Sequence, residues 1–185
     1  VTLIAVSKTF PPSAIAEAHA AGQRAFGENY VQECLDKMRA LPGSGIQWHF
    51  LGPIQSNKTR LIAENFDWVH GVDRIKVAER LSAARPERMR FLDVCVQVNI
   101  SGEETKSGVA PEAVYALASV VARLPRLRLR GLMAIPEPGA HGAGAAVRRG
   151  RPGGRCRVRP RDAGLTAPVL ARLRTTGSRS RLDWL

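Results

Sequence analysis

The stretch TLIAVSKTFPPSAIAEAHAAG, residues 2–22, predicts a buried strand followed by a helix. Six of the first seven residues suit a strand that is covered on both faces, and we expect this strand over residues 2–9. Pro11 and Pro12 suit the first turn of a helix, and Gly22 suits its end. Lys8 stands at the end of the strand, where burial would lower its pKa and free the amine as a nucleophile. The alternative is that the strand ends at Ser7 and Lys8 extends into solvent.

The same alternation of strand and helix continues through the first 138 residues. The expected strands are 2–9, 24–29, 46–54, 67–73, 91–101 and 127–138, and the expected helices are 13–22, 30–43, 56–66 (with Ser56 as N-cap), 74–87 and 110–125. Repeats of this kind predict a parallel sheet covered by helices. An open doubly wound sheet and a (β/α)8 barrel both fit the pattern. Neither GxGxxG after the first strand nor GxxxxGK[ST] occurs, which disfavours dinucleotide and P-loop sites.

The net charge of +12 is concentrated in the last quarter of the 185 residues. Residues 1–138 hold 17 Lys and Arg against 14 Asp and Glu, whereas residues 139–185 hold 11 Arg against two Asp. The basic character therefore does not make the repeat region a nucleic-acid-binding domain. No apolar run reaches the roughly 18 residues of a membrane span, and no signal-peptide pattern occurs. The absence of an initial Met indicates that the sequence lacks its true beginning.

The cysteines and histidines do not suggest a metal site. Cys34, Cys95 and Cys156 are widely spaced with no CxxC pair, and the four histidines form no HxxxH or HExxH pattern. An odd number of cysteines without a disulfide framework is typical of a reducing cytoplasm.

Residues 139–185 have a different composition and predict a separate segment. Arg, Gly, Ala and Pro make up 29 of these 47 residues, with no Glu, Lys, Ile, Phe, Met, Asn or Gln. We expect this segment to be disordered, because it cannot bury enough apolar surface. One interpretation is an Arg/Gly-rich tail that binds nucleic acid. The interpretation we favour is an out-of-frame reading of a GC-rich gene, because those four residues have GC-rich codons.

Polar and small residues gather where the predicted strands end. They are Lys8 and Thr9; Gly27, Glu28 and Asn29; His49 and Gly52; His70 and Asp73; Asn99 and Ser101; and Met133 with Ala134. Functional residues of parallel α/β folds lie at these carboxyl ends, so we expect this rim to carry the site.

Several separate motifs resemble one known family. They are AVSKT (5–9), AFGENYVQE (25–33), WHFLGPIQSNK (48–58) and RGLMAIP (130–136), with DWVHGVDR, VQVNIS and KSGV between them in the same order. Together they resemble the pyridoxal phosphate homeostasis protein family, related to the N-terminal domain of alanine racemase. The resemblance runs from Val1 to about Pro138.

The resemblance implies a fold-type III (β/α)8 barrel, present here as about six strands followed by an irregular basic tail. It implies that Lys8 holds pyridoxal 5'-phosphate (PLP) as a Schiff base. Members of the family look like carriers and regulators of PLP supply without established enzymatic activity. We accordingly expect a cytoplasmic monomer whose partners are PLP and PLP-dependent apo-enzymes.

Three further residues are expected to contact the cofactor, and two of them have an alternative role. Asn29 could line the pocket or cap the following helix. His49 could stack near the pyridine ring or be a hydrogen-bonded core histidine. Met133 is expected to pack under the cofactor. Lys106 could be a second lysine that accepts PLP or a solvated surface lysine.

The sequence departs from the family after the sixth strand. The family's GMSxD-like and VRIG-like segments, which carry the phosphate site, have no match in residues 139–185, and the family's helix before the first strand is also missing. We therefore expect this chain to fold poorly and to hold PLP weakly. Two other functions stay open: a racemase-like enzyme, which would need a second acid/base group, and nucleic-acid binding through the Arg-rich tail.

Overall fold

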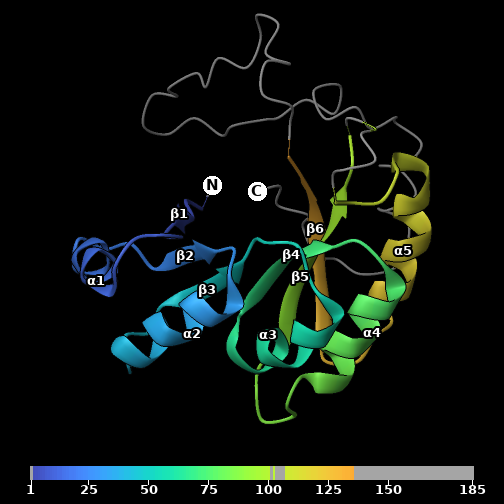
Figure 1. Ribbon diagram of the computed structural model, residues 1–185. Coiled ribbons are helices and arrows are strands. Elements are labelled where there is room, and N and C mark those ends of the chain that lie inside the picture. Colours follow the sequence, from blue (N-terminus) through green and yellow to red (C-terminus); the bar gives the residue numbers. More distant parts are fainter. Residues whose placement is uncertain (1, 101, 103–106, 136–185) are drawn as a thin grey trace, which may run out of the picture.

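The computed structural model describes residues 2–100, 102 and 107–135, which form a repeating β/α structure (Figure 1). Its strands are β1 (Ala5–Val6), β2 (Ala25–Glu28), β3 (Gln47–Phe50), β4 (Trp68–Val72), β5 (Leu92–Val98) and β6 (Leu127–Ala134). Its helices are α1 (Pro12–Ala20), α2 (Val31–Ala40), α3 (Thr59–Asn65), α4 (Ile75–Ala84) and α5 (Val114–Val121), with short 3-10 turns η1 (Ser56–Lys58) and η2 (Pro111–Ala113). The predicted alternation is confirmed, with elements shorter than expected.

The six described strands form one parallel sheet in the order of the sequence, β1-β2-β3-β4-β5-β6. A doubly wound sheet would reverse direction at a switch point, whereas each strand here pairs with the strand before it. This consecutive order is that of a (β/α) barrel, which decides between the two architectures that the sequence leaves open. Within the described residues, β1 and β6 are the two edges of the sheet.

The hydrophobic core lies between the sheet and the helices that cover one of its faces (Figure 1). It includes Phe26, Phe50, Val69, Val94 and Val96 from the strands, together with Cys34, Ile62, Val77, Leu81 and Val121 from the helices. Successive residues of a strand point to opposite faces, so the residues between these core positions face the other side. That side carries polar and aromatic groups, because the paired positions across β2 to β6 are Gly27, His49, Trp68, Asp93 and Arg128.

Strand β1 is shorter and more exposed than predicted. The expectation of a strand over residues 2–9 buried on both faces is wrong, because Leu3 is 74% and Val6 is 49% exposed. The physical reason is that, among the described residues, β1 has a single neighbouring strand, β2, whereas a strand inside the sheet has two. The sequence pattern did not distinguish an edge strand from a central one.

The start of the third helix also differs from the prediction. Ser56 is not an N-cap; it begins η1, for which no side-chain cap is formed. Its carbonyl oxygen instead accepts a hydrogen bond from the hydroxyl of Thr59 at 2.9 Å, where α3 begins.

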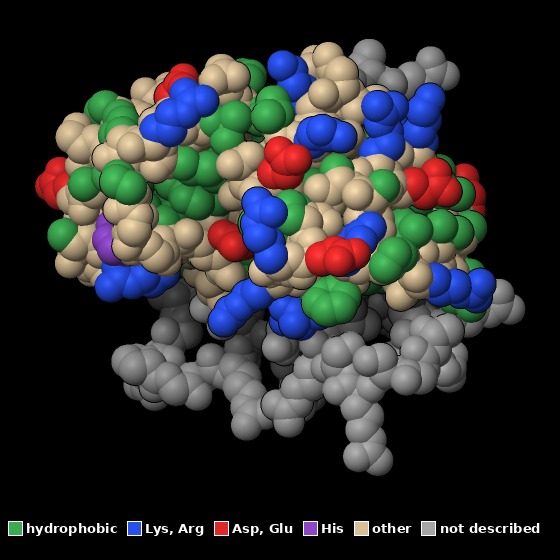
Figure 2. Space-filling model, turned by 90° about the horizontal axis from the view of Figure 1, so that it is seen from below, with side chains coloured by type: hydrophobic (Ala, Val, Ile, Leu, Met, Phe, Trp, Pro, Cys, Tyr) green, Lys and Arg blue, Asp and Glu red, His purple; other side chains and the backbone are tan. Residues whose placement is uncertain are grey.

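Charged side chains of both signs lie on the surface. Figure 2 shows Lys and Arg interspersed with Asp and Glu over one face of the molecule. Among the described residues, no helix combines the length and the hydropathy that crossing a membrane requires. The predicted tail, residues 139–185, lies outside the part of the chain that the structure describes, as do Ser101 and Lys106.

Candidate functional site

Lys8 lies in a tight turn directly after β1. The backbone N–H of Phe10 donates a hydrogen bond to the carbonyl oxygen of Ser7 at 3.0 Å, so Lys8 and Thr9 are the two central residues of the turn. Thr9 has a φ of 69°, the sign that the third residue of a type II turn requires. Of the two alternatives that the sequence leaves open, the structure shows the second, because the strand ends before Lys8 and the lysine is exposed. Its amine makes no hydrogen bond or ion pair with any residue that the structure describes.

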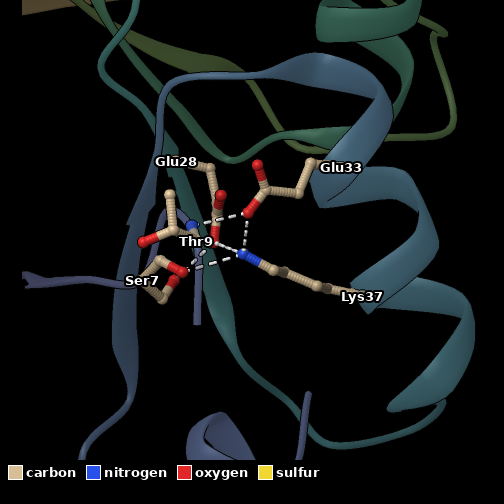
Figure 3. Close-up of polar contacts among 5 residues, drawn as sticks. All are labelled: Ser7, Thr9, Glu28, Glu33 and Lys37. Atoms are coloured by element: carbon tan, nitrogen blue, oxygen red, sulfur yellow. Dashed lines mark hydrogen bonds and ion pairs between the residues drawn. The ribbon is translucent and has the colours of Figure 1, made fainter. Parts of the chain in front are cut away.

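A buried polar cluster lies behind this turn, between β1, β2 and α2 (Figure 3). We call it the Lys37 cluster; its members are Ser7, Thr9, Glu28, Glu33 and Lys37. The ammonium of Lys37 donates to the Ser7 carbonyl oxygen at 2.8 Å, to Glu28 Oε1 at 2.8 Å and to Glu33 Oε1 at 2.6 Å. Glu28 Oε1 also accepts from the Ser7 hydroxyl at 2.6 Å, and Glu33 Oε1 accepts from the Thr9 N–H at 2.7 Å.

The cluster combines the ammonium group of Lys37 with the carboxylates of Glu28 and Glu33. The side chains of Lys37 and Glu28 are 5% and 0% exposed, whereas Glu33 is 32% exposed. Burial lowers the pKa of Lys37, but hydrogen bonds to Glu28 and Glu33 outweigh it and leave the pKa raised. The hydrogen bond from Lys37, helped by the one from Thr9, lowers the pKa of Glu33. Lys37 is therefore a fixed cation with all three N–H donors in use.

Glu28 does not lie on the rim as the sequence predicts. It faces the helices, where it pairs with Lys37, and its Oε2 is buried without a partner among the described residues. Two features of the sequence do indicate this arrangement, although the rim prediction overlooked them. A carboxylate within the buried strand AFGE requires a buried partner, and the Glu33–Lys37 spacing of four places both side chains on one helix face.

Asn29 follows β2 at the same end of the sheet as Lys8. Val6 of β1 pairs with Gly27 of β2. Lys8 and Asn29 each come two residues later, so they occupy equivalent positions after two neighbouring parallel strands. The carbonyl oxygen of Asn29 lies so close to Gly52 that a Cβ there would approach it to 2.3 Å. Gly52 therefore serves close packing of the backbone after β2 and β3.

Met133 lies near the carboxyl end of β6, where it pairs with Gln97 of β5. It is half-buried. Lys8 and Met133 are thus carried to the same end of the sheet by its two described edge strands.

His49 lies deeper than Lys8, inside β3, and is 2% exposed. Its Nδ1 is 2.9 Å from Nε2 of His70, and its Nε2 is 3.2 Å from Oε1 of Gln47. With the Gln47 oxygen toward the ring, the matching tautomer of His49 carries its proton on Nε2 and accepts the N–H of His70 at Nδ1; the opposite amide orientation reverses both roles. The ring also stacks on Trp68, with centroids 5.4 Å apart.

Both histidines are held in the neutral form. Burial, together with the neighbouring His70, lowers the pKa of His49 to about 3, and burial lowers the pKa of His70 to about 4. His70 was expected on the rim but is 3% exposed. This pair was not predicted, although the alternating residues of WHF and WVH in neighbouring strands place both rings on one face.

Comparison with known proteins identifies the fold and the class of protein. Residues 1–143 match the family described as "Alanine racemase, N-terminal domain", and the chain belongs to that family. Alanine racemase of Corynebacterium glutamicum is 18% identical with a TM-score of 0.55, covering 72% of this chain and 39% of that chain, and it shows the shared fold alone. The predicted alanine racemase-like barrel fold is confirmed.

The particular relatives are pyridoxal phosphate homeostasis proteins. The one from Pseudomonas aeruginosa is 63% identical over 143 residues, which are 77% of this chain and 62% of that protein. The one from Escherichia coli (strain K12) is 59% identical over 141 residues, 75% of this chain and 60% of that protein. The resemblance stated from the motifs is confirmed, and the chain spans 60–62% of the length of these two relatives.

Two solved structures of PipY from Synechococcus elongatus are also similar. The structure without PLP is 44% identical with a TM-score of 0.69, and the structure with PLP bound is 42% identical with a TM-score of 0.66. Each comparison covers 75% of this chain and 65% of that chain.

Proposed function

We propose that this chain binds pyridoxal 5'-phosphate covalently through Lys8 and serves in PLP homeostasis. The observation that carries the proposal is the exposed, unpaired amine of Lys8 in the turn after β1, among the described residues of a chain that matches PLP homeostasis proteins. When bound, PLP supplies an aldehyde that reacts with a primary amine and a ring that withdraws electrons.

The residues present fit the aldehyde end of the cofactor. A nucleophilic amine has to give up a proton, which Lys37 resists because two carboxylates stabilise its charged form. Lys8 has no such partner among the described residues and lies at the end of the sheet where the strands terminate at their carboxyl ends. Lys8 is thus the better nucleophile of the two.

Three further residues are proposed to form the surroundings of the cofactor. Asn29, beside Lys8, offers an amide for a polar group of the ring, and Met133 offers an apolar contact from the opposite edge. His49 supports the site from beneath as a neutral ring, fixed by His70 and Gln47.

The phosphate end is proposed to be held weakly. In barrels, phosphate binds after strands seven and eight, and the described residues contain six strands. The backbone N–H groups that would bind an anion are therefore not supplied by the described part of the chain. Retention of PLP depends on the covalent bond from Lys8, and we expect the cofactor to be lost on dialysis.

The cellular role follows the relatives that this chain resembles. We propose a monomer that works in the cytoplasm and passes PLP to PLP-dependent apo-enzymes. The two described cysteines, Cys34 and Cys95, are free and buried, which fits a reducing compartment. A racemase activity and nucleic-acid binding by the Arg-rich tail stay predictions, separable by a racemisation assay and a salt-dependent gel shift.

Borohydride trapping tests the role of Lys8. The Lys8 amine, after releasing a proton to solvent, bonds to the aldehyde carbon of PLP, and one water leaves. Borohydride then donates hydride to the carbon of the C=N bond and water supplies a proton to the nitrogen, giving a stable secondary amine that mass spectrometry locates in the sequence. We expect the adduct on Lys8, its loss in Lys8→Ala, and its retention in Lys76→Ala, which removes an exposed lysine of α4. Equal labelling of Lys8 and Lys76 in the unsubstituted chain would contradict the proposal.

A further inference from the structure

We infer that Glu33 and Lys37 are positioning residues that fix the backbone on both sides of Lys8 for covalent capture of an aldehyde. The inference rests on the proposed function, because it concerns the same amine. Neither residue is proposed to touch the cofactor. Both act on the peptide groups next to Lys8.

The contacts of the Lys37 cluster bracket Lys8 in the sequence (Figure 3). On one side, the Lys37 ammonium donates to the carbonyl oxygen of Ser7 at 2.8 Å. On the other side, Glu33 Oε1 accepts the backbone N–H of Thr9 at 2.7 Å. Lys37 and Glu33 are in turn joined at 2.6 Å, so a closed set of contacts surrounds the residue whose own side chain is left free.

The turn needs such support because its backbone is strained. Thr9 has a φ of 69°, a region that is an outlier for a β-branched residue. Conformations of this kind are unfavourable and persist only where the surrounding structure fixes them. The hydrogen bond from the Thr9 N–H to Glu33 is formed in this conformation. The structure therefore couples the strained residue next to Lys8 to helix α2.

The support is anchored in the interior of the protein. Lys37 is held at 2.8 Å by Glu28, whose side chain is fully buried, and Glu28 also accepts the Ser7 hydroxyl. Solvent would weaken an exposed ion pair, whereas the Lys37–Glu28 pair is buried and its carboxylate belongs to β2. Glu33 is the most exposed of the three charged members of the cluster, so it can be replaced with less damage to the core than Glu28 or Lys37.

Holding the turn raises the rate of capture because the amine is presented in fewer orientations. Misplacement of a reacting group by about 1 Å can reduce a rate by about a hundredfold. We expect a loss of about ten- to a hundredfold in the rate of PLP capture when the Thr9 contact is removed.

The test compares three variants of the full chain. Glu33→Ala removes the acceptor of the Thr9 N–H, and Glu33→Gln removes the charge but keeps an oxygen that can accept the same hydrogen bond. Asp36→Ala is the matched control, since Asp36 is an exposed acid of the same helix that pairs with Arg39. For each variant, hydrogen exchange at the Thr9 amide, the denaturation midpoint and the borohydride-trapped labelling of Lys8 relative to Lys76 are measured.

We expect Glu33→Ala to speed exchange at Thr9 at least about tenfold and to lower the Lys8-to-Lys76 labelling ratio, while Glu33→Gln restores most of both. Asp36→Ala should match the unsubstituted chain. Glu33→Ala with unchanged labelling of Lys8 would overturn the positioning role. So would a labelling loss that follows the denaturation midpoint and is not restored in Glu33→Gln. If the unsubstituted chain is not labelled on Lys8 at all, the proposed function fails, and exchange at Thr9 still decides whether Glu33 fixes the turn.

Discussion

Lys8 and Lys37 approach the same short turn, yet their amines have opposite surroundings. Lys8 is exposed and unpaired among the described residues, and Lys37 is buried with an oxygen atom for each of its donors. The first is suited to react, and the second is suited to hold a backbone group in place. The two lysines thus have different roles, and the burial and the neighbouring charges of each side chain decide which role it has.

The His49–His70 pair makes the stability of the folded state depend on pH. The pKa values of about 3 and about 4 lie below the ordinary 6.5, so the folded protein keeps both rings neutral while the unfolded chain takes up protons. The stabilisation is complete above about pH 6.5 and decreases as the pH falls toward 4. At pH 5 we expect a loss of about 2 kcal/mol for each histidine, measured by urea denaturation across this range.

The variant His70→Gln is the control for this pH dependence. It removes one titrating ring and keeps a polar side chain beside His49. Its free energy of unfolding should fall less steeply between pH 6.5 and pH 5 than that of the unsubstituted chain. An equal slope in both proteins would show that other groups cause the acid sensitivity.

The junction of β2 and α2 depends on a buried pair of charges. Lys37→Met would leave Glu28 buried without a cation, and breaking a buried pair in this way costs about 3–5 kcal/mol. Adding Glu28→Gln removes the uncompensated charge, so the double variant should be more stable than Lys37→Met alone by at least about 1 kcal/mol.

Denaturation of the single and double variants, analysed as a cycle, measures this coupling. Arg39→Met breaks an exposed ion pair of the same helix and should change the stability by less than about 1 kcal/mol. A double variant that is no more stable than Lys37→Met would argue against the charge-pair explanation.

The sequence predicts the elements better than their surroundings. The six described strands and the five described helices are where the alternation of apolar runs and helical periodicity places them, because those patterns are local. The exposure of β1 and the pairing of Glu28 with Lys37 depend on which strand lies at the edge and on which helix covers it. Those are properties of the assembled sheet: the strand AFGE indicates that Glu28 needs a buried partner, but it does not indicate which helix supplies that partner.

The candidate site shows the same division. Lys8 and Asn29 are found at the carboxyl ends of neighbouring strands, as the spacing predicts. The sequence does not show the roles of Glu33 and Lys37, because these side chains contact backbone atoms that lie 24 and 30 residues away in the sequence. Composition and motifs indicate which side chains can react, and the three-dimensional structure indicates which ones hold them.

The molecule as a whole combines a region that matches its family with a segment of different composition. The family match covers residues 1–143, and residues 139–185 contain 11 Arg and no Lys. We propose that an out-of-frame reading produces this composition. Resequencing the coding DNA around codon 138 should reveal a single-base change after which another frame encodes a strand–helix pattern with a GMSxD-like segment. If no single-base change restores such a pattern, the explanation fails.

The consecutive order of the strands has a consequence for how the chain acquires its structure. Every described strand from β2 onward pairs with the strand made immediately before it, so no described pairing waits for a distant part of the chain. The sheet can therefore grow by one β/α unit at a time as the polypeptide leaves the ribosome, with each new strand added to an edge that is already formed. The turn that carries Lys8 would then be locked as soon as α2 has been synthesised, well before β6 exists.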